Sequence, residues 1–227
     1  MSSEPSGKTR TLIGVIDYGM GNRRSVQKAL EHVGAAAPIT ADHGRLRACA
    51  GVVLPGVGAF PEAMRRLGAL GLGDLVRTLA GDGKPLLGIC LGMQLLFQSS
   101  QEIEPTPGLG LLNGPVTRLD AGELRIPHIG WNEVRFERPS PLTVGLPSGG
   151  CPFYHVHSMV PRPEDPGDVI GTAQYGERFA TIVGRGSVFG VQFHPEKSSR
   201  LGLTLLESFV ALSARSAAHA DGSAVPA

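Results

Sequence analysis

The chain has 227 residues and a formal net charge of +1, with 41% hydrophobic and 18% charged residues. This length predicts one domain, or at most two small ones, and the near-neutral charge without a basic run gives no reason to expect a nucleic-acid partner. No run of about 18 apolar residues, no apolar signal segment and no disulfide framework is evident, which argues against a membrane span or a secreted protein and predicts a cytoplasmic one.

Alternating strands and helices fill the first half of the chain, between polar tails that we expect to be disordered at residues 1–10 and 216–227. Strands are predicted where short apolar runs show almost no alternation, as when both faces of a sheet are covered: 11–17, 51–56 and 85–89. Helices are predicted where apolar residues recur at helical spacing: 23–34, 59–83 with glycine interruptions, and 92–100. This rhythm predicts an α/β fold with a mostly parallel sheet and helices on both faces.

The second half of the chain changes to short strands separated by turn residues, at 133–138, 153–160, 171–176, 179–184 and 187–193. An amphipathic helix is predicted at 200–215. We therefore expect a single folded domain at residues 11–215.

Cys90 lies in the segment GICLG (88–92), at the predicted end of a strand and the start of a helix. G-x-C-x-G has the form of a nucleophile elbow, in which a sharp, strained turn presents the thiol. Gly88 and Gly92 fit this interpretation because side chains there would collide with the neighbouring strand and helix. The helix N-terminus would favour the thiolate, and the N–H of Leu91 would stabilise an oxyanion. The alternative is a buried structural cysteine.

A cysteine nucleophile needs a base, and the segment SVFGVQFHPEKS (187–198) supplies a candidate. His194 follows a predicted strand, at the edge where ligands gather in open α/β sheets. Glu196 lies two residues on, so in extended chain it would project to the same side and orient the imidazole. Cys90, His194 and Glu196 would then form a triad. The alternative is an ordinary surface loop.

A third segment, VVLPGVGAF (52–60), ends a predicted strand in Pro-Gly-Val-Gly. Glycines on both sides of Val57 let the backbone approach a ligand or rotate a peptide plane. An N–H near Val57 or Gly58 is therefore a candidate second oxyanion donor. The alternative is an ordinary tight turn.

Three further features have two interpretations each. The segment DYGMGNRR (17–24) is similar to a dinucleotide-binding turn, but Arg24 stands where the third glycine belongs, which argues against nucleotide binding. Cys151, His155 and His157 suggest a metal site, but ligands on one strand rarely converge, which favours a structural role. Trp131, the only tryptophan, is either a core residue or an exposed anchor for a partner.

Together these motifs resemble class I glutamine amidotransferases over about residues 11–212. GICLGMQLLF and FHPEKS are similar to the nucleophile and histidine motifs of that family. DYGMGN, LPGVGAF, PHIGWN and FYHVHS are similar to motifs of the glutaminase subunits of imidazole glycerol phosphate synthases. The resemblance implies a three-layer α/β glutaminase fold with a nucleophile elbow, and a heterodimer with a separate (β/α)8-barrel synthase subunit.

The resemblance also implies an activity and the residues that carry it. L-glutamine would be hydrolysed to glutamate and ammonia, without a metal or organic cofactor. The ammonia would pass to the barrel, which forms imidazole glycerol phosphate and aminoimidazole carboxamide ribotide in histidine biosynthesis. The implied roles are catalysis for Cys90, His194 and Glu196, the oxyanion hole for Val57, Gly58 and Leu91, substrate binding for Gly56, Gln94, Ser158 and Met159, and the partner interface for Asn22, Trp131 and Lys197.

Two positions depart from the family's pattern, since Met159 and His155 stand where aromatic residues are common. Side-chain contacts between Met159 and glutamine are therefore left open. Other interpretations are the glutaminase of vitamin B6 synthesis, a cysteine hydrolase or peptidase, and a non-catalytic regulatory subunit. PHIGWN and DYGMGN argue against the first, Gln94 and the Pro-Gly-Val-Gly turn against the second, and the intact triad motifs against the third.

Overall fold

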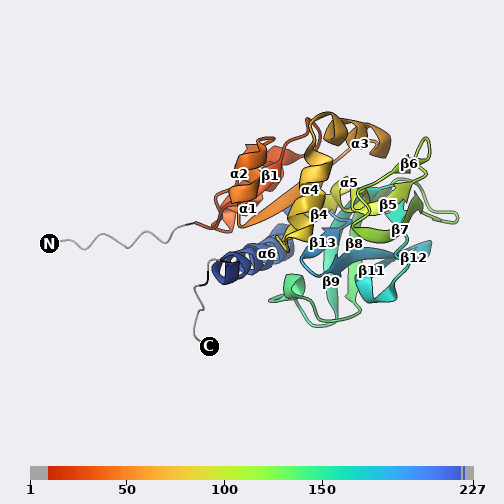
Figure 1. Ribbon diagram of the computed structural model, residues 1–227. Helices are drawn as coiled ribbons and strands as arrows, with labels where there is room; N and C mark the ends of the chain where they lie inside the picture. Colours follow the sequence, from red (N-terminus) through yellow and green to blue (C-terminus); the bar gives the residue numbers. More distant parts are fainter. Residues whose placement is uncertain (1–9, 221, 223–227) are drawn as a thin grey trace.

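The structure, a computed structural model, describes residues 10–220 and residue 222 (Figure 1). Residues 1–9, 221 and 223–227 of the predicted tails therefore lie outside the described residues. Residues 216–220 instead continue the last helix, α6 (Ser199–Ala220). This corrects the predicted helix end at residue 215, and the reason is local, since the added residues are rich in alanine, the best helix former.

Nine strands of the described chain form one sheet, in the order β2-β1-β3-β4-β13-β12-β11-β8-β9. The strands on one side pair in parallel: β2 (Ile39–Thr40), β1 (Ile13–Ile16), β3 (Gly51–Gly56), β4 (Leu86–Cys90) and β13 (Val188–Val191). The strands on the other side pair antiparallel: β12 (Glu177–Arg185), β11 (Val169–Tyr175), β8 (His128–Phe136) and β9 (Gly150–His157). The predicted α/β fold is confirmed, with parallel pairing in the half where helices connect the strands.

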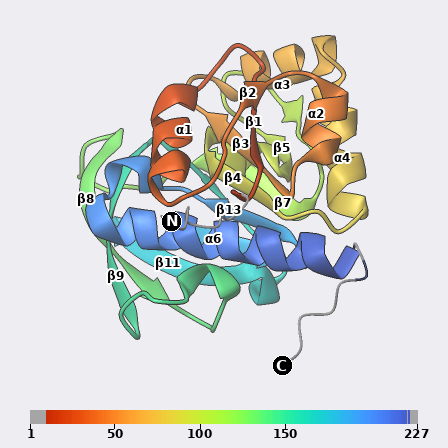
Figure 2. The ribbon, with the colours of Figure 1, turned by 90° about the vertical axis from the view of Figure 1, so that its left-hand side faces the viewer.

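Helices cover both faces of the parallel strands and create three layers. On one face α1 (Arg23–His32) and α6 pack side by side over the sheet (Figure 2). A core that includes Val26, Leu30, Leu205 and Phe209 lies beneath them. On the other face lie α2 (His43–Ala48), α3 (Phe60–Ala69), α4 (Leu72–Gly81) and α5 (Leu91–Leu95), over a second core. The predicted helix at 59–83 is divided into α3 and α4 at Gly71, whose φ is +63°.

A second, four-stranded sheet in the described chain corrects two predictions. Its order is β10-β7-β5-β6, with β5 (Phe97–Ser100), β6 (Thr106–Pro107), β7 (Leu112–Arg118) and β10 (Met159–Pro161). Residues 97–100 are therefore strand rather than the end of a helix, because β5 pairs with β7, which the sequence analysis missed. The predicted strand at 153–160 is broken at Ser158, where the chain leaves β9 in the large sheet and enters β10 in the small one.

Helix α6 is long and apolar enough, by length and composition alone, to cross a membrane over Ser199–His219. Its apolar side chains Leu205, Leu206 and Phe209 are fully buried in the core between the helix and the sheet. A helix that packs one face against a sheet needs apolar residues on that face, and this need accounts for the apolar composition of α6.

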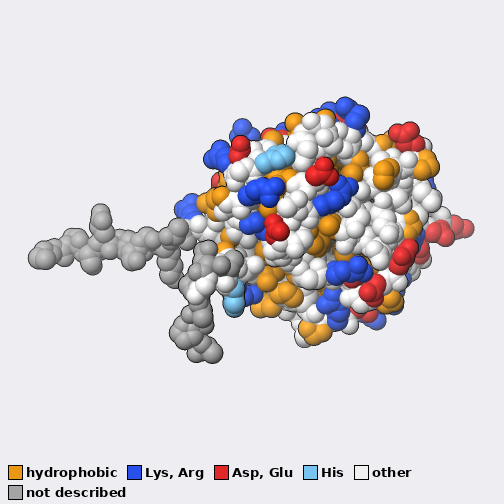
Figure 3. Space-filling view, viewed as in Figure 1, with side chains coloured by type: hydrophobic (Ala, Val, Ile, Leu, Met, Phe, Trp, Pro, Cys, Tyr) orange, Lys and Arg blue, Asp and Glu red, His pale blue; other side chains and the backbone are white. Residues whose placement is uncertain are grey.

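Charged side chains of both signs are interspersed over the face shown in Figure 3. Ion pairs such as Arg66–Glu62 on α3 and Arg77–Asp74 on α4 contribute to this mixed surface. On this face the mixture of charges agrees with the net charge of +1.

Glycines make room for the sharp turn between β4 and α5. A Cβ atom at Gly92 would lie 1.8 Å from the carbonyl oxygen of Leu54, on the neighbouring strand β3. A Cβ atom at Gly88 would lie 2.6 Å from the carbonyl oxygen of Gly92. Both obstacles are backbone atoms, which cannot move aside as a flexible side chain can. The collisions expected from the sequence are therefore present, and the elbow requires both glycines.

We predict that Gly92→Ala lowers the free energy of unfolding by about 3 kcal/mol or more, because a buried methyl group is forced onto backbone. Urea denaturation followed by circular dichroism measures the change. Gly68→Ala is the matched control, since Gly68 lies within α3 and a Cβ atom there meets nothing within 4 Å. That control should be stabilising by about 0.5–1 kcal/mol. Equal stability of Gly92→Ala and the parent protein would contradict the packing argument.

Candidate active site

The three predicted motifs meet at one edge of the large sheet. Gly56 at the end of β3 pairs in register with Cys90 at the end of β4, and Val191 of β13 pairs with Ile89. Because the three strands are parallel, the segments that follow them emerge at the same edge. The order of the strands therefore brings Cys90 and His194 together, although they lie far apart in the sequence.

Cys90 adopts the strained conformation that a nucleophile elbow requires. Its φ and ψ are 55° and −113°, and only 6% of the residue is exposed. The sulfur is 3.8 Å from the amide nitrogen of Gln192, which donates to it, and 3.8 Å from the carbonyl oxygen of Val156. Helix α5 ends at Leu95, so it is shorter than expected. Such a short helix has little dipole, and what it presents near Cys90 is the free N–H groups of its first turn.

The other two cysteines have different surroundings. Cys49 and Cys151 are free and buried, and neither lies at the sheet edge that holds Cys90. Burial raises the pKa of both thiols, and that of Cys151 reaches about 11 through burial and the nearby charge of Glu133. These thiols therefore stay protonated at neutral pH and are poor nucleophiles.

His194 and Glu196 form a buried, hydrogen-bonded pair. The Nδ1 atom of His194 lies 2.8 Å from Oε1 of Glu196, and their side chains are 3% and 0% exposed. The expected contact is present, but its geometry differs, because Pro195–Lys197 is a turn of 3-10 helix rather than extended chain. Asn22 also donates from Nδ2 to Oε1 of Glu196, at 3.2 Å. These two contacts fix the carboxylate, and through it the ring of His194.

The surroundings of His194 favour its protonated form. Burial lowers its pKa, but hydrogen bonding to Cys90 and Glu196 and their negative charges outweigh burial and raise the pKa to about 10. The folded-state pKa is thus above the ordinary value of about 6.5. Protonated His194 therefore stabilises the fold fully below about pH 6.5, and this contribution is lost as the pH rises through about 10.

A cavity of about 290 Å³ lies beside this pair and brings most of the predicted site residues together. Its lining includes the expected residues Val57, Gly58, Cys90, Leu91, Gln94, Ser158, Met159, His194 and Lys197. Gly56 lies outside this lining. Because it has no side chain, Leu91 and Tyr18 can pack closely against its backbone. A larger cavity of about 530 Å³ lies beside Cys49 and Lys84, away from the ends of β4 and β13, and contains none of the predicted catalytic residues.

Two buried glutamines join the elbow to strand β10. The amide nitrogen of Gln94 donates to the carbonyl oxygen of Met159 and to Oε1 of Gln192, each at 3.1 Å. The amide nitrogen of Gln192 in turn faces Cys90. Gln94 therefore holds the cavity wall in place. Gln192 was not predicted, because a lone polar residue at the end of a strand carries no distinguishing sequence signal.

Three buried histidines pack against one another, and two of them, His128 and His157, form an ordered hydrogen-bonded chain. Nδ1 of His157 donates to the carbonyl oxygen of Met159 at 3.1 Å, so Nε2 of His157 must accept from Nδ1 of His128, 3.2 Å away. Nε2 of His128 then accepts from the amide of Asn132 at 3.3 Å. His155 uses both ring nitrogens on the Phe153 carbonyl and the Thr181 hydroxyl.

Burial is the main cause that lowers the pKa of these three histidines, and that of His155 falls to about 3. They are neutral and engaged with the protein, as the structural interpretation of His155 and His157 expects. No group of three His, Cys, Asp or Glu residues within the described chain is arranged to hold a metal ion.

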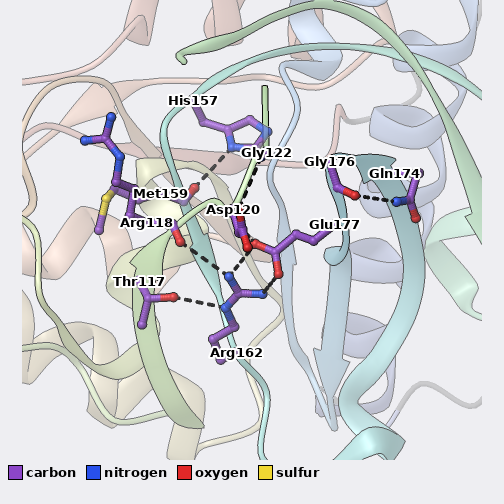
Figure 4. Close-up of polar contacts among 10 residues, drawn as sticks. All are labelled: Thr117, Arg118, Asp120, Gly122, His157, Met159, Arg162, Gln174, Gly176 and Glu177. Atoms are coloured by element: carbon purple, nitrogen blue, oxygen red, sulfur yellow. Dashed lines mark hydrogen bonds and ion pairs between the residues drawn. The ribbon is translucent and has the colours of Figure 1, made fainter. Parts of the chain in front are cut away.

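Arg162 braces the strand that carries Met159 (Figure 4). Its guanidinium donates to the hydroxyl of Thr117 at 3.0 Å and to Oε2 of Glu177 at 2.7 Å. Thr117 belongs to β7 in the small sheet and Glu177 to β12 in the large one. Arg162 thus ties the two sheets together beside the cavity, where Figure 4 also shows the contact between His157 and Met159.

Glu102 is a cavity residue that the sequence analysis missed. One carboxylate oxygen accepts the backbone N–H of Phe60 at 2.7 Å, at the start of α3. This bond fixes the orientation of the Glu102 carboxyl group in the cavity wall. An acidic residue in the loop QEIEPTPG offers no signal, because such residues are common in exposed loops.

The residues expected at a partner interface have different environments. Trp131 is 53% exposed on β8, next to Ile129 at 59%, so its interpretation as a core residue is wrong. Its ring packs edge-on against Tyr154, with centroids 6.1 Å apart. Lys197 is exposed at the cavity, whereas Asn22 is half-buried and occupied with Glu196.

Comparisons with known proteins find similar sequences over most of the chain. The model of the class-I glutamine amidotransferase family matches residues 14–212. The imidazole glycerol phosphate synthase subunit HisH of Moorella thermoacetica is 55% identical over 199 residues, which are 87% of this chain and 93% of that protein. The HisH subunit of Geobacillus thermodenitrificans is 47% identical and covers 89% of this chain and 96% of its own length.

Solved structures share the fold at lower identity. A structure described as PurLQS from Thermotoga maritima has a TM-score of 0.72 and 22% identity, covering 90% of this chain and 99% of its own. Another, described as a glutamine amidotransferase, has a TM-score of 0.70 and 24% identity, covering 89% and 98%. Both carry the architecture described above.

We predict that His194 stays protonated as the pH rises from about 6.5, the ordinary pKa of histidine, to about 10. Imidazole ¹⁵N NMR measures this protonation. Glu196→Gln removes a charge and a charge-assisted bond, and should lower this midpoint. Glu207→Gln, at an exposed position on α6, is the matched control and should leave it unchanged. Deprotonation near pH 6.5 in the unaltered protein would refute the proposed ionic pair.

Proposed function

Since this chain belongs to the class-I glutamine amidotransferases, among the HisH subunits of imidazole glycerol phosphate synthase, we propose that it hydrolyses L-glutamine with Cys90, His194 and Glu196 as its catalytic triad. One observation carries the assignment of these residues. The strained Cys90 and the hydrogen-bonded His194 lie on one cavity, at the meeting point of three parallel strands.

The chemistry follows from the roles that these groups can fill. The Cys90 thiolate attacks the carboxamide carbon of glutamine, and the N–H groups of Leu91 and of the Val57–Gly58 segment stabilise the oxyanion. Protonated His194 gives its proton to the leaving ammonia, which leaves a thioester on Cys90. The neutral imidazole then takes a proton from water, whose oxygen attacks the thioester and releases glutamate. Glu196 holds the imidazole in its working orientation throughout.

Binding of glutamine uses the two ends of the cavity. We assign the α-ammonium group to the carboxylate of Glu102, the one acidic residue among the described residues that line the cavity, because an opposite charge offsets the desolvation of the ammonium. The backbone of Ser158 and Met159, fixed by Gln94 and His157, would contact the rest of the substrate. Gly56 makes room for Leu91 and Tyr18, and we assign it this packing role in place of the expected contact with glutamine.

The ammonia is proposed to pass to a (β/α)8-barrel synthase subunit in a cytoplasmic heterodimer. The barrel would form imidazole glycerol phosphate and aminoimidazole carboxamide ribotide, a step of histidine biosynthesis. The exposed pair Trp131 and Ile129 on β8, with Lys197 at the cavity, supports a docking surface on this side of the molecule.

Timing of the reaction is proposed to depend on the peptide between Val57 and Gly58. Val57 is 42% exposed and Gly58 has a φ of +108°, so this peptide lies at the surface in a conformation that only glycine adopts easily. In one orientation its N–H completes the oxyanion hole, and in the other its carbonyl repels the oxyanion. Docking of the barrel would select the first orientation.

We predict that Cys90→Ala abolishes glutamate release from glutamine, because only this thiol lies at the elbow. Cys49→Ala and Cys151→Ala are matched controls at buried sites outside the cavity and should retain most of the activity. When Cys90→Ala is in complex with the barrel subunit, added ammonia should restore the formation of imidazole glycerol phosphate by the barrel. Glutamine hydrolysis by that variant would disprove the assigned nucleophile.

We predict that Trp131→Ala weakens binding to the barrel subunit by about 2 kcal/mol, roughly 30-fold in Kd, as expected for an exposed aromatic anchor. Isothermal titration calorimetry measures this, and the free subunit should stay folded. Val144→Ala is the control, because Val144 is 64% exposed but lies beside α6. The docking surface would be wrong if both variants bound as tightly as the parent protein.

A further inference from the structure

A buried tyrosine holds the strand that leads into the proposed oxyanion loop. The hydroxyl of Tyr18 donates to the carbonyl oxygen of Pro55 at 2.8 Å, and Tyr18 is 1% exposed. Tyr18 follows β1, whereas Pro55 lies near the end of β3, two residues before Val57. This hydrogen bond is the specific polar link between the first loop of the domain and the oxyanion segment.

The contact is part of a continuous packing of residues 17–22 against residues 55–58. A Cβ atom at Gly56 would lie 2.8 Å from the Tyr18 hydroxyl oxygen and 2.8 Å from Cβ of Leu91. A Cβ atom at Gly21 would lie 3.4 Å from the Gly56 backbone, and one at Gly58 would lie 2.9 Å from the end of the Met20 side chain. Gly21 of the DYGMGN segment therefore serves this packing, which is a use other than dinucleotide binding.

We propose that Tyr18 is a positioning residue, which fixes the Pro55–Gly56 peptide so that reorientation is confined to the Val57–Gly58 peptide. This inference rests on the proposed function. When one peptide of a glycine-rich segment rotates, the neighbouring peptides can rotate in the opposite sense to compensate. The segment then populates many conformations. With the Pro55 carbonyl held, the loop has few alternatives, and the N–H that completes the oxyanion hole is preorganised.

The hydroxyl is suited to this task because it remains a donor. Burial, and then the negative charge of Cys90, raise the pKa of Tyr18 above its ordinary value. The influence of Cys90 agrees with a hydroxyl that lies close behind the nucleophile. Ionisation of Cys90 thus leaves Tyr18 protonated and its bond to Pro55 intact.

The test is Tyr18→Phe, which removes the hydroxyl and keeps the ring. In the complex with the barrel synthase subunit, kcat for glutamine hydrolysis should fall about fivefold, the factor expected for one neutral hydrogen bond, with KM unchanged. Affinity for glutamate γ-semialdehyde, which forms a tetrahedral adduct with a thiol, should fall by the same factor. Tyr175→Phe is the matched control, since its hydroxyl also donates to a backbone carbonyl, that of Arg125, at 2.8 Å.

Each other outcome has a definite meaning. Unchanged kcat and aldehyde affinity in Tyr18→Phe would overturn the inference, and so would a raised KM with unchanged kcat. Equal losses in Tyr18→Phe and Tyr175→Phe, or a Tyr18→Phe protein that does not fold, would assign the hydroxyl to general stability and also overturn it. An unaltered complex that neither hydrolyses glutamine nor binds the aldehyde would overturn the proposed function, and this inference with it.

Discussion

The contact between Gly92 and the carbonyl group of Leu54 is the constraint on which the rest of the site depends. It lets α5 begin immediately after β4, with the backbone of one element against the backbone of the next strand. Cys90 is then forced to a positive φ, and its side chain points away from the sheet and into the cavity. The cost of this strained residue, of the order of 1–3 kcal/mol, is offset by the buried cores on both sides.

Every other functional group is placed relative to that turn. The parallel order of β3, β4 and β13 places the proposed oxyanion segment on one side of Cys90 and His194 on the other. The change of sheet at Ser158 brings Met159 to the third side, where Gln94 and His157 hold its carbonyl. The site is thus assembled by backbone geometry, and side-chain hydrogen bonds make small adjustments to it.

Local patterns in the sequence predicted the elements whose signals are local. The apolar runs of β1, β3 and β4, the helices α1 and α6, and the glycines around Cys90 are of this kind. The small sheet escaped prediction because β5, β7 and β10 are stabilised by pairing with each other, and Phe97–Ser100 has no strand signal by itself. The bond between Asn22 and Glu196 was not predicted for a similar reason, since it joins residues 174 positions apart in the chain. Glu196 was placed correctly beside His194, although through a 3-10 turn that no spacing rule would indicate.

The cluster of neutral histidines has a consequence for how the domain unfolds in acid. His128, His155 and His157 all lie in the β8–β9 hairpin, and their pKa values are lowered, chiefly by burial. A lowered folded-state pKa means that stability is lost as the pH falls below the ordinary value of about 6.5, because the unfolded chain takes up protons first. We therefore expect mild acid to destabilise this hairpin, which also carries the exposed Trp131.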